Sequence, residues 1–187
     1  MSVGLVGQPA REDRTQRSDR VVRLSATSSE WRKPLSSELD AAVQRLRAVL
    51  VTELHGILLD AQPPHAPPLW PREELQFACY SRGGHYAPHV DAESDAGTRT
   101  APGTVGRLFT AIYYPNSGEE VWGKQSGGGG ALRLWPEGSY ESVEVSAVGD
   151  RLIVFSSTLG HEVLPVVTST AGVQRCAFTS WFSAVRA

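Results

Sequence analysis

Histidine and aspartate lie two positions apart at His89 and Asp91, and this pair is well suited to metal chemistry. In an extended strand alternate side chains share one face, so both point the same way, with Cα atoms about 6.6–7 Å apart. One imidazole and one carboxylate at that spacing can bind a single ion. Taken alone, the pair is a weak signal and is more typical of a surface histidine beside a solvated aspartate.

A third ligand would turn this pair into a metal centre, and His161 is the candidate. It opens a second expected strand, 70 residues after Asp91. Two histidines and one carboxylate on one side of an octahedral ion leave positions open for a cosubstrate and O₂, as in non-haem Fe(II) oxygenases. His85 and His89 could instead form a zinc-binding pair on a helix, but the nearby Gly83, Gly84 and Pro88 disfavour a helix there.

The elements that must position these residues are one helix and many short strands. Apolar residues at three- and four-residue spacing predict a helix over about 36–59: Leu39, Val43, Leu46, Leu50, Leu54 and Ile57. Five prolines in 61–71 indicate a connector. Short β-type runs then follow without helices between them, which favours a mainly β sandwich or barrel. The runs are 75–80, 107–114, 131–135, 142–147, 151–156, 161–167 and 173–183, with a further strand possible at 21–24.

Residues 7–20 are polar and charged, and we expect 1–20 to form a mobile arm. Residues 92–106 and 127–130 are expected to be flexible loops. The 187 residues, 41% of them hydrophobic, suit a single soluble domain. The net charge of −2 indicates no overall basic field that would favour nucleic acid or membranes, and no run of about 18 apolar residues occurs.

The two cysteines, Cys79 and Cys176, each lie in an apolar run. We expect unpaired thiols, in a reducing compartment or packed in the core, rather than a disulfide framework. The N-terminus has no apolar segment of the secretory type. The expected protein is therefore cytoplasmic or nuclear and binds neither nucleic acid nor membrane, with its oligomeric state open.

Five segments resemble, in the same order, the prolyl hydroxylase branch of the 2-oxoglutarate oxygenases, and most closely its Egl-nine type with bacterial and protist relatives. They are 77–91 (FACYSRGGHYAPHVD), 107–116 (RLFTAIYYPN), 128–138 (GGGALRLWPEG), 149–165 (GDRLIVFSSTLGHEVLP) and 175–182 (RCAFTSWF). The resemblance implies a double-stranded β-helix (jelly-roll) core over about 73–183, with a supporting N-terminal helix, in one domain over 1–187. It also implies that His89, Asp91 and His161 are the catalytic Fe(II) ligands.

Arg175 is the expected partner of the distal carboxylate of 2-oxoglutarate. It lies inside an apolar run, and a buried carboxylate needs a fixed cation, for which a planar guanidinium is well suited. A slip of strand register would instead turn Arg175 outward, towards solvent. The resemblance implies that Tyr114 binds the same carboxylate and that Tyr80 and Thr179 line the cosubstrate pocket. For the tyrosines, ordinary core packing is the alternative.

The resemblance also implies the reaction, a protein prolyl 4-hydroxylation. Fe(II), O₂ and 2-oxoglutarate would hydroxylate a prolyl residue of a protein or peptide, giving succinate and CO₂, with ascorbate as reductant and oxygen sensing as a role. Trp181, Arg107 and Tyr86 are the expected substrate contacts. Alternatives are an oxygenase acting on another side chain or a small molecule, and a β-barrel module that binds metal without turnover. A structural zinc site fits less well, because three ligands leave the ion open and no CxxC pair exists.

Overall fold

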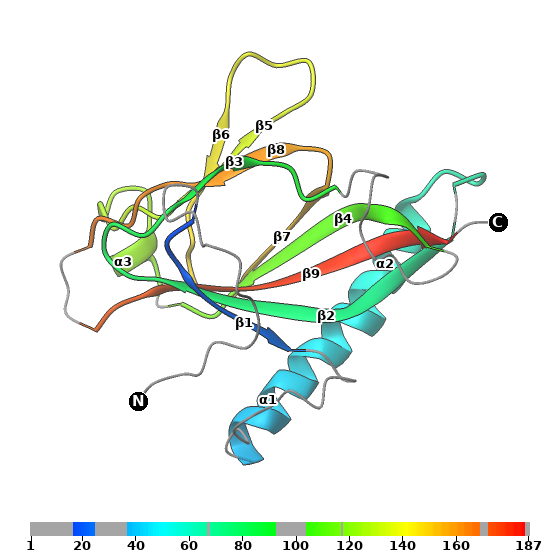
Figure 1. Cartoon of the computed structure of the whole chain (residues 1–187), viewed down its shortest axis with the longest axis horizontal. Helices are drawn as coiled ribbons and strands as arrows, with labels where there is room; N and C mark the ends of the chain where they lie inside the picture. The colour runs from blue at the N-terminus through cyan, green and yellow to red at the C-terminus, as the bar shows by residue number, and fades with distance from the viewer. Residues whose placement is uncertain are drawn as a thin grey trace.

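The computed structural model describes residues 17–24, 37–66, 68–92, 104–116, 118–168 and 172–185. Two antiparallel sheets face each other, and a long helical segment crosses behind the larger one (Figure 1). This arrangement confirms the predicted mainly β architecture with a supporting helix.

Residues 37–61 form one continuous helical segment. It consists of α1 (Ser37–Ala48), a π-helical turn (Val49–Glu53) and α2 (Leu54–Ala61). Its buried side chains pack against apolar residues of the larger sheet; they are Val43, Leu50, Leu54 and Leu58 from the helix and Leu69, Leu75, Ala111 and Phe182 from the sheet. The predicted helix over 36–59 is confirmed. It occupies the outer face of the sheet and leaves the inner face to line a cavity.

None of the helices in the described ranges is both long and apolar enough to cross a membrane.

The larger sheet has the strand order β1-β2-β9-β4-β7. The strands are β1 (Arg20–Leu24), β2 (Leu69–Tyr80), β4 (Thr104–Tyr114), β7 (Arg151–Ser156) and β9 (Arg175–Val185). β2 begins at Leu69, inside the proline-rich segment 61–71 that is predicted to be a connector. The prediction of a connector is therefore wrong for residues 69–71. Pro71 is tolerated because β1 pairs with β2 only from Leu75 onward, so among the described strands Pro71 has a neighbour, β9, on one side only.

The smaller sheet has the order β3-β8-β5-β6. Its strands are β3 (Tyr86–His89), β8 (Gly160–Val163), β5 (Leu132–Trp135) and β6 (Val143–Val145). The run predicted over 161–167 is shorter than expected, because beyond Val163 it continues only as a bridge between Val166 and Gly129. A short helix, α3 (Glu119–Trp122), lies between β4 and β5 in the chain.

Gly127–Gly130 is held in place, and the prediction of a flexible loop there is wrong. The carbonyl oxygen of Gly128 accepts hydrogen bonds from the N–H groups of Val167 (2.9 Å) and Thr168 (3.1 Å). Gly129 has φ +69°, and a Cβ there would lie 2.4 Å from the Pro165 carbonyl oxygen, so a larger residue would not fit. The other predicted loop, 92–106, lies mostly outside the described residues, and β4 already begins at Thr104.

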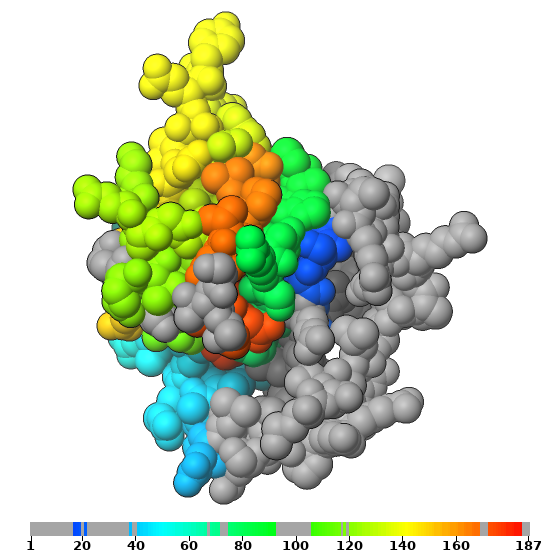
Figure 2. Space-filling model, turned by 90° about the vertical axis from the view of Figure 1, so that its left-hand side faces the viewer, coloured from blue at the N-terminus to red at the C-terminus, as the bar shows by residue number. Residues whose placement is uncertain are grey.

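The segment just before β1 is docked, which corrects the predicted mobile arm for residues 17–20; residues 1–16 lie outside the described ranges. The N–H of Ser18 donates to the carbonyl oxygen of His85 at 3.1 Å. The Arg17 guanidinium binds the Asp19 carboxylate and lies 4.5 Å from the centre of the Tyr86 ring. Figure 2 shows this blue segment against the green surface around β3.

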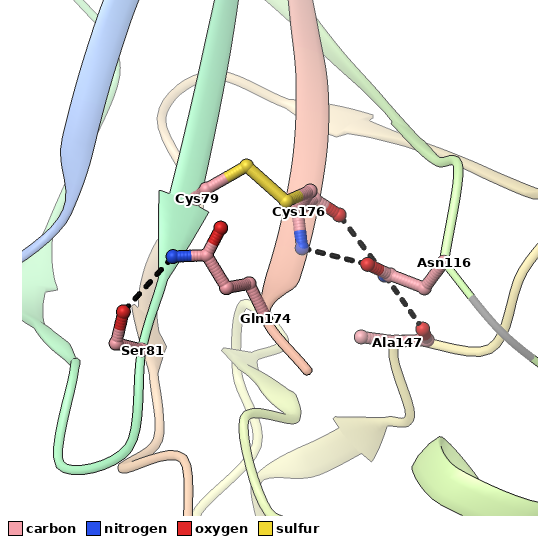
Figure 3. The surroundings of a disulfide bond; sticks show 6 residues. All are labelled: Cys79, Ser81, Asn116, Ala147, Gln174 and Cys176. Atoms are coloured by element: carbon pink, nitrogen blue, oxygen red, sulfur yellow. Dashed lines mark hydrogen bonds between the residues drawn. A yellow bond between two sulfur atoms is a disulfide. The ribbon is translucent and has the colours of Figure 1, made fainter. Parts of the chain in front are cut away.

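Cys79 and Cys176 form a disulfide, so the prediction of unpaired thiols is wrong (Figure 3). They lie 97 residues apart in sequence but directly opposite each other on β2 and β9. Successive residues of a strand point to opposite faces. The disulfide is therefore on the outer face, while the next pair, Tyr80 and Arg175, faces the cavity. The cytoplasmic location stays a prediction.

Candidate active site

His89, Asp91 and His161 converge between the two sheets. The Nε2 atoms of His89 and His161 lie 3.6 Å from Oδ1 and Oδ2 of Asp91, respectively. One ligand atom from each of the three lies within 4.8 Å of the others. The cause is the pairing of β3 with β8, which places His89 opposite His161, with Asp91 two residues further along. The three side chains fit one metal ion and leave one side of it open.

Each histidine of this triad is oriented by a carbonyl oxygen two residues earlier in the chain. The Nδ1 of His89 contacts the oxygen of Ala87 at 2.8 Å, and that of His161 contacts the oxygen of Leu159 at 2.9 Å. Because a carbonyl only accepts, Nδ1 carries the proton and Nε2 presents its lone pair to the centre. Burial, followed by the neighbouring His89, lowers the pKa of His161. The buried imidazole is therefore in the neutral form that binds a metal.

Asp91 is held by the larger sheet. Its Oδ2 accepts hydrogen bonds from Oγ1 of Thr110 (2.9 Å) and Nε1 of Trp181 (3.1 Å), and the Thr110 hydroxyl lies 2.9 Å from that of Ser157. Burial acts to raise the pKa of Asp91, but its hydrogen bonds and the two histidines together outweigh burial and lower it well below its ordinary value. The carboxylate is ionised, as a metal ligand must be.

Arg175, Tyr114 and Tyr80 form the deep end of the same region, with exposures of 2%, 0% and 2%. The Nη2 of Arg175 donates to the Tyr114 hydroxyl and its Nε to the Gly130 carbonyl oxygen, both at 3.1 Å. The guanidinium also lies 5.1 Å from the ring centre of Tyr80 and 4.9 Å from that of Tyr114. The β2–β9 register therefore turns Arg175 inward, as predicted.

The Arg175 guanidinium is a buried positive charge with neutral neighbours. No carboxylate in the described part of the chain forms an ion pair with it. Burial raises the pKa of Tyr114 more than Arg175 lowers it, so the phenol stays protonated and can donate a hydrogen bond. A buried cation without an anion is unfavourable. The deep end is therefore built for an anionic ligand.

One cavity joins the metal-binding end to Arg175. Five of the predicted residues line this cavity together with the triad: Tyr80, Tyr86, Arg107, Thr179 and Trp181. Tyr114 contacts Arg175 but does not line the cavity. At the open end, the Arg107 guanidinium lies 4.0 Å from the Trp181 ring centre, and the rings of Tyr86 and His89 stack at 3.7 Å.

Sequence reasoning missed four polar residues of the site: Arg17, Gln76, Thr110 and Ser157. Gln76 alternates with Ala78 and Tyr80 in the run LQFACY, so strand parity could have placed it on the inner face. Thr110 shares its strand face with Tyr114, which gives a similar signal. Arg17 and Ser157 reach the site through the tertiary fold and have no such signal.

A family model described as the 2OG-Fe(II) oxygenase superfamily matches residues 75–183, more than half of the chain. The match contains every cavity residue named above except Arg17. The predicted single domain over 1–187 stays a prediction.

Curated relatives and a solved structure are similar to the chain. The hypoxia-inducible factor prolyl hydroxylase of Caenorhabditis elegans is 32% identical over 146 residues, which are 76% of this chain and 17% of that protein. Human Egl nine homolog 1 is 33% identical over 114 residues, 59% of this chain and 22% of that protein. The chain therefore spans less than a quarter of these two relatives.

The crystal structure of a Pseudomonas putida prolyl-4-hydroxylase superposes with a TM-score of 0.54 at 28% identity. The superposition covers 95% of this chain and 77% of that one. These matches confirm both the predicted resemblance and the predicted jelly-roll fold.

Proposed function

This chain belongs to the 2OG-Fe(II) oxygenase superfamily, and from this premise we propose that it is a protein prolyl 4-hydroxylase. The observation that carries the proposal is one cavity with three converging metal ligands at one end and, at the other, a buried arginine that forms no ion pair with a carboxylate of the described residues. The names of its relatives support a prolyl residue as the target.

In this proposal His89, Asp91 and His161 hold Fe(II). The iron, when bound, supplies O₂ activation coupled to decarboxylation of 2-oxoglutarate and hydroxylation of an unactivated C–H bond. The protein contributes two imidazoles and an ionised carboxylate to the ion. Since these three side chains are oriented by their own hydrogen bonds, the remaining side stays available to ligands.

Arg175 and Tyr114 bind the distal carboxylate of 2-oxoglutarate in this proposal. The guanidinium supplies the charge. The Tyr114 hydroxyl, which accepts a hydrogen bond from Arg175, donates a hydrogen bond to the carboxylate. Tyr80 and Thr179 line the space between this carboxylate and the metal. The chelating end of the cosubstrate then faces the triad.

The prolyl residue of a protein or peptide enters at the open end, between Trp181, Arg107 and Tyr86. The indole N–H of Trp181 is fixed by Asp91, and its ring is covered by Arg107, so the ring has a defined orientation next to the metal centre. The ring of Tyr86 is held in place by stacking on the ring of His89. We further propose ascorbate as reductant and a role in oxygen sensing, both from the family resemblance, and a cytoplasmic location.

The test measures succinate and peptide hydroxylation with Fe(II), ascorbate and 2-oxoglutarate. The probes are a hypoxia-inducible-factor-type prolyl peptide, a Gly-X-Y repeat peptide and free proline, with the Asp91→Ala variant as control. One oxygen atom gained on a prolyl residue, located by mass spectrometry, supports the proposal. A hydroxyl on another residue or only on free proline favours a different oxygenase. Succinate no higher than in the control contradicts an enzymatic function.

A further inference from the structure

Gln76 is a buried side-chain amide that faces the cavity. It is 8% exposed and lies on the inner face of β2 with Ala78 and Tyr80. Opposite it on β9 is Thr179, which is also 8% exposed. The Gln76 amide has no hydrogen bond within the part of the chain that the structure describes. An amide can donate two hydrogen bonds and accept two, and leaving them unmade when buried is costly.

Asn116 shows how an amide with a structural task is bonded. Its Oδ1 accepts from the N–H of Cys176 at 2.6 Å, and its Nδ2 donates to the carbonyl oxygens of Ala147 and Cys176, both at 2.9 Å (Figure 3). The backbone thus uses most of the capacity of this amide. Among the residues that the structure describes, the amide of Gln76 has no comparable partner. This difference leaves the Gln76 amide available to a ligand in the cavity that it lines.

The sheet register places Gln76 between the two ends of the cavity. The inner-face residues of β9 are, in order from the metal-binding end, Trp181, Thr179, Ala177 and Arg175. Trp181 contacts Asp91, and Arg175 closes the deep end. Opposite Thr179, Gln76 lies one two-residue step, about 7 Å, from Trp181 and two such steps from Arg175. It is therefore nearer to the metal centre than to the arginine.

We propose that Gln76 is a further cosubstrate-binding residue, whose amide N–H donates to the chelating 2-oxo acid end of 2-oxoglutarate. This inference rests on the proposed function. 2-Oxoglutarate carries oxygen atoms at both ends and only methylene groups between them, and Arg175 and Tyr114 already serve the distal carboxylate. The oxygens of the chelating end only accept hydrogen bonds, so they need donors, which the amide supplies.

A carbonyl oxygen of the polypeptide substrate is the competing partner for this amide. The substrate reaches the metal from the open end, where Arg107 and Tyr86 lie, and Gln76 lies on the inward side of Trp181. The position therefore favours the cosubstrate over the substrate.

The test is anaerobic calorimetry with Mn(II) in place of Fe(II), comparing wild type with Gln76→Met, which keeps the length but removes the amide. The ligands are 2-oxoglutarate and oxalate, a short dianion that can chelate the metal without reaching Arg175. Gln76→Met should weaken both about tenfold, whereas Arg175→Met should weaken only 2-oxoglutarate. Gln76→Glu, which presents an acceptor, should bind more weakly still. Gln174→Met, an exposed amide bonded to Ser81, is the matched control and should change neither.

Equal affinity of wild type and Gln76→Met for both ligands overturns the inference. So does a raised KM for a prolyl peptide with unchanged affinity for both ligands, which would assign the amide to the substrate. The melting temperature of each variant checks its fold. If wild type does not bind 2-oxoglutarate through Arg175, the proposed function itself fails. If the binding of 2-oxoglutarate depends on Arg175 but is unchanged in Gln76→Met, only this inference fails and the proposed function stands.

Discussion

The two ends of the cavity are built in different ways. The deep end is made by Tyr80, Tyr114 and Arg175 on long strands of one sheet, and each of these residues is at most 2% exposed. At the open end the side chains of His89 and Asp91 keep 19% and 13% exposure, and the ligands depend on both sheets. The proposed binding site for the distal carboxylate is therefore preformed by strand register, whereas the candidate metal centre depends on how the two sheets are held together.

Replacing Asp91 with alanine is expected to have the largest effect, and it acts on the open end alone. The triad loses its carboxylate, together with the hydrogen bonds to Thr110 and Trp181. Bound Mn(II) after dialysis should fall to background in metal analysis, and the rise in melting temperature on adding metal should disappear. Asp60→Ala, on the exposed surface of α2, should behave as wild type. A variant that still held one equivalent of metal would show that the centre lies elsewhere.

Replacing both Cys79 and Cys176 with serine tests what stabilises the deep end. The disulfide closes a loop of 97 residues, so its loss should lower the free energy of unfolding by about 4 kcal/mol in urea titrations. The affinity for 2-oxoglutarate should change little, because the bond lies on the outer face and Asn116 still holds β9. Reductant should bring wild type to the stability of the double variant and leave that variant unchanged. A wild type insensitive to reductant would argue that the bond does not form.

Arg175→Met tests whether the two ends act independently. A buried carboxylate would lose its cation, so the Kd for 2-oxoglutarate should rise about 100-fold in calorimetry. The affinity for Mn(II) should not change. Arg133→Met is the matched control, because Arg133 pairs with Glu144 and Glu162 away from the cavity. A parallel loss of metal affinity would mean that the ends are coupled.

Thr110→Val should have the smallest effect of the four and refines the description of the open end. Valine keeps the shape of threonine but removes the hydroxyl that donates to Asp91. The affinity for Mn(II) should fall about tenfold, measured by competition with a chelator. Thr158→Val, at an exposed position, is the control. Unchanged affinity would indicate that Trp181 alone is sufficient to orient the carboxylate.

Features with a local signal could be predicted from the sequence. The helix followed from its apolar stripe, and the triad from the spacing of His89 and Asp91 together with the matching motifs around His161. Arg175 was conspicuous because a charge inside an apolar run is unusual. The β2–β9 register in the structure agrees with the inward orientation that this argument needed.

Features that depend on contacts between distant segments could not be predicted. The disulfide requires β2 and β9 to pair in one register, and neither cysteine alone indicates that register. The docking of Arg17 depends on the position of Tyr86, to which the chain returns only after the helix and β2. Gln76 is an intermediate case. Strand parity places it on the inner face, but only the structure shows that it is buried and has no hydrogen bond to another described residue.

Asp91 follows a strand of the smaller sheet but is hydrogen-bonded to side chains of the larger one. An ion bound to it and to both histidines would restrict separation of the two layers at the open end. The metal-free protein should therefore exchange its amide hydrogens faster in β3 and β8 than the loaded protein, with little change in β9. Iron supply would then affect how long each molecule resists proteolysis, in addition to its turnover.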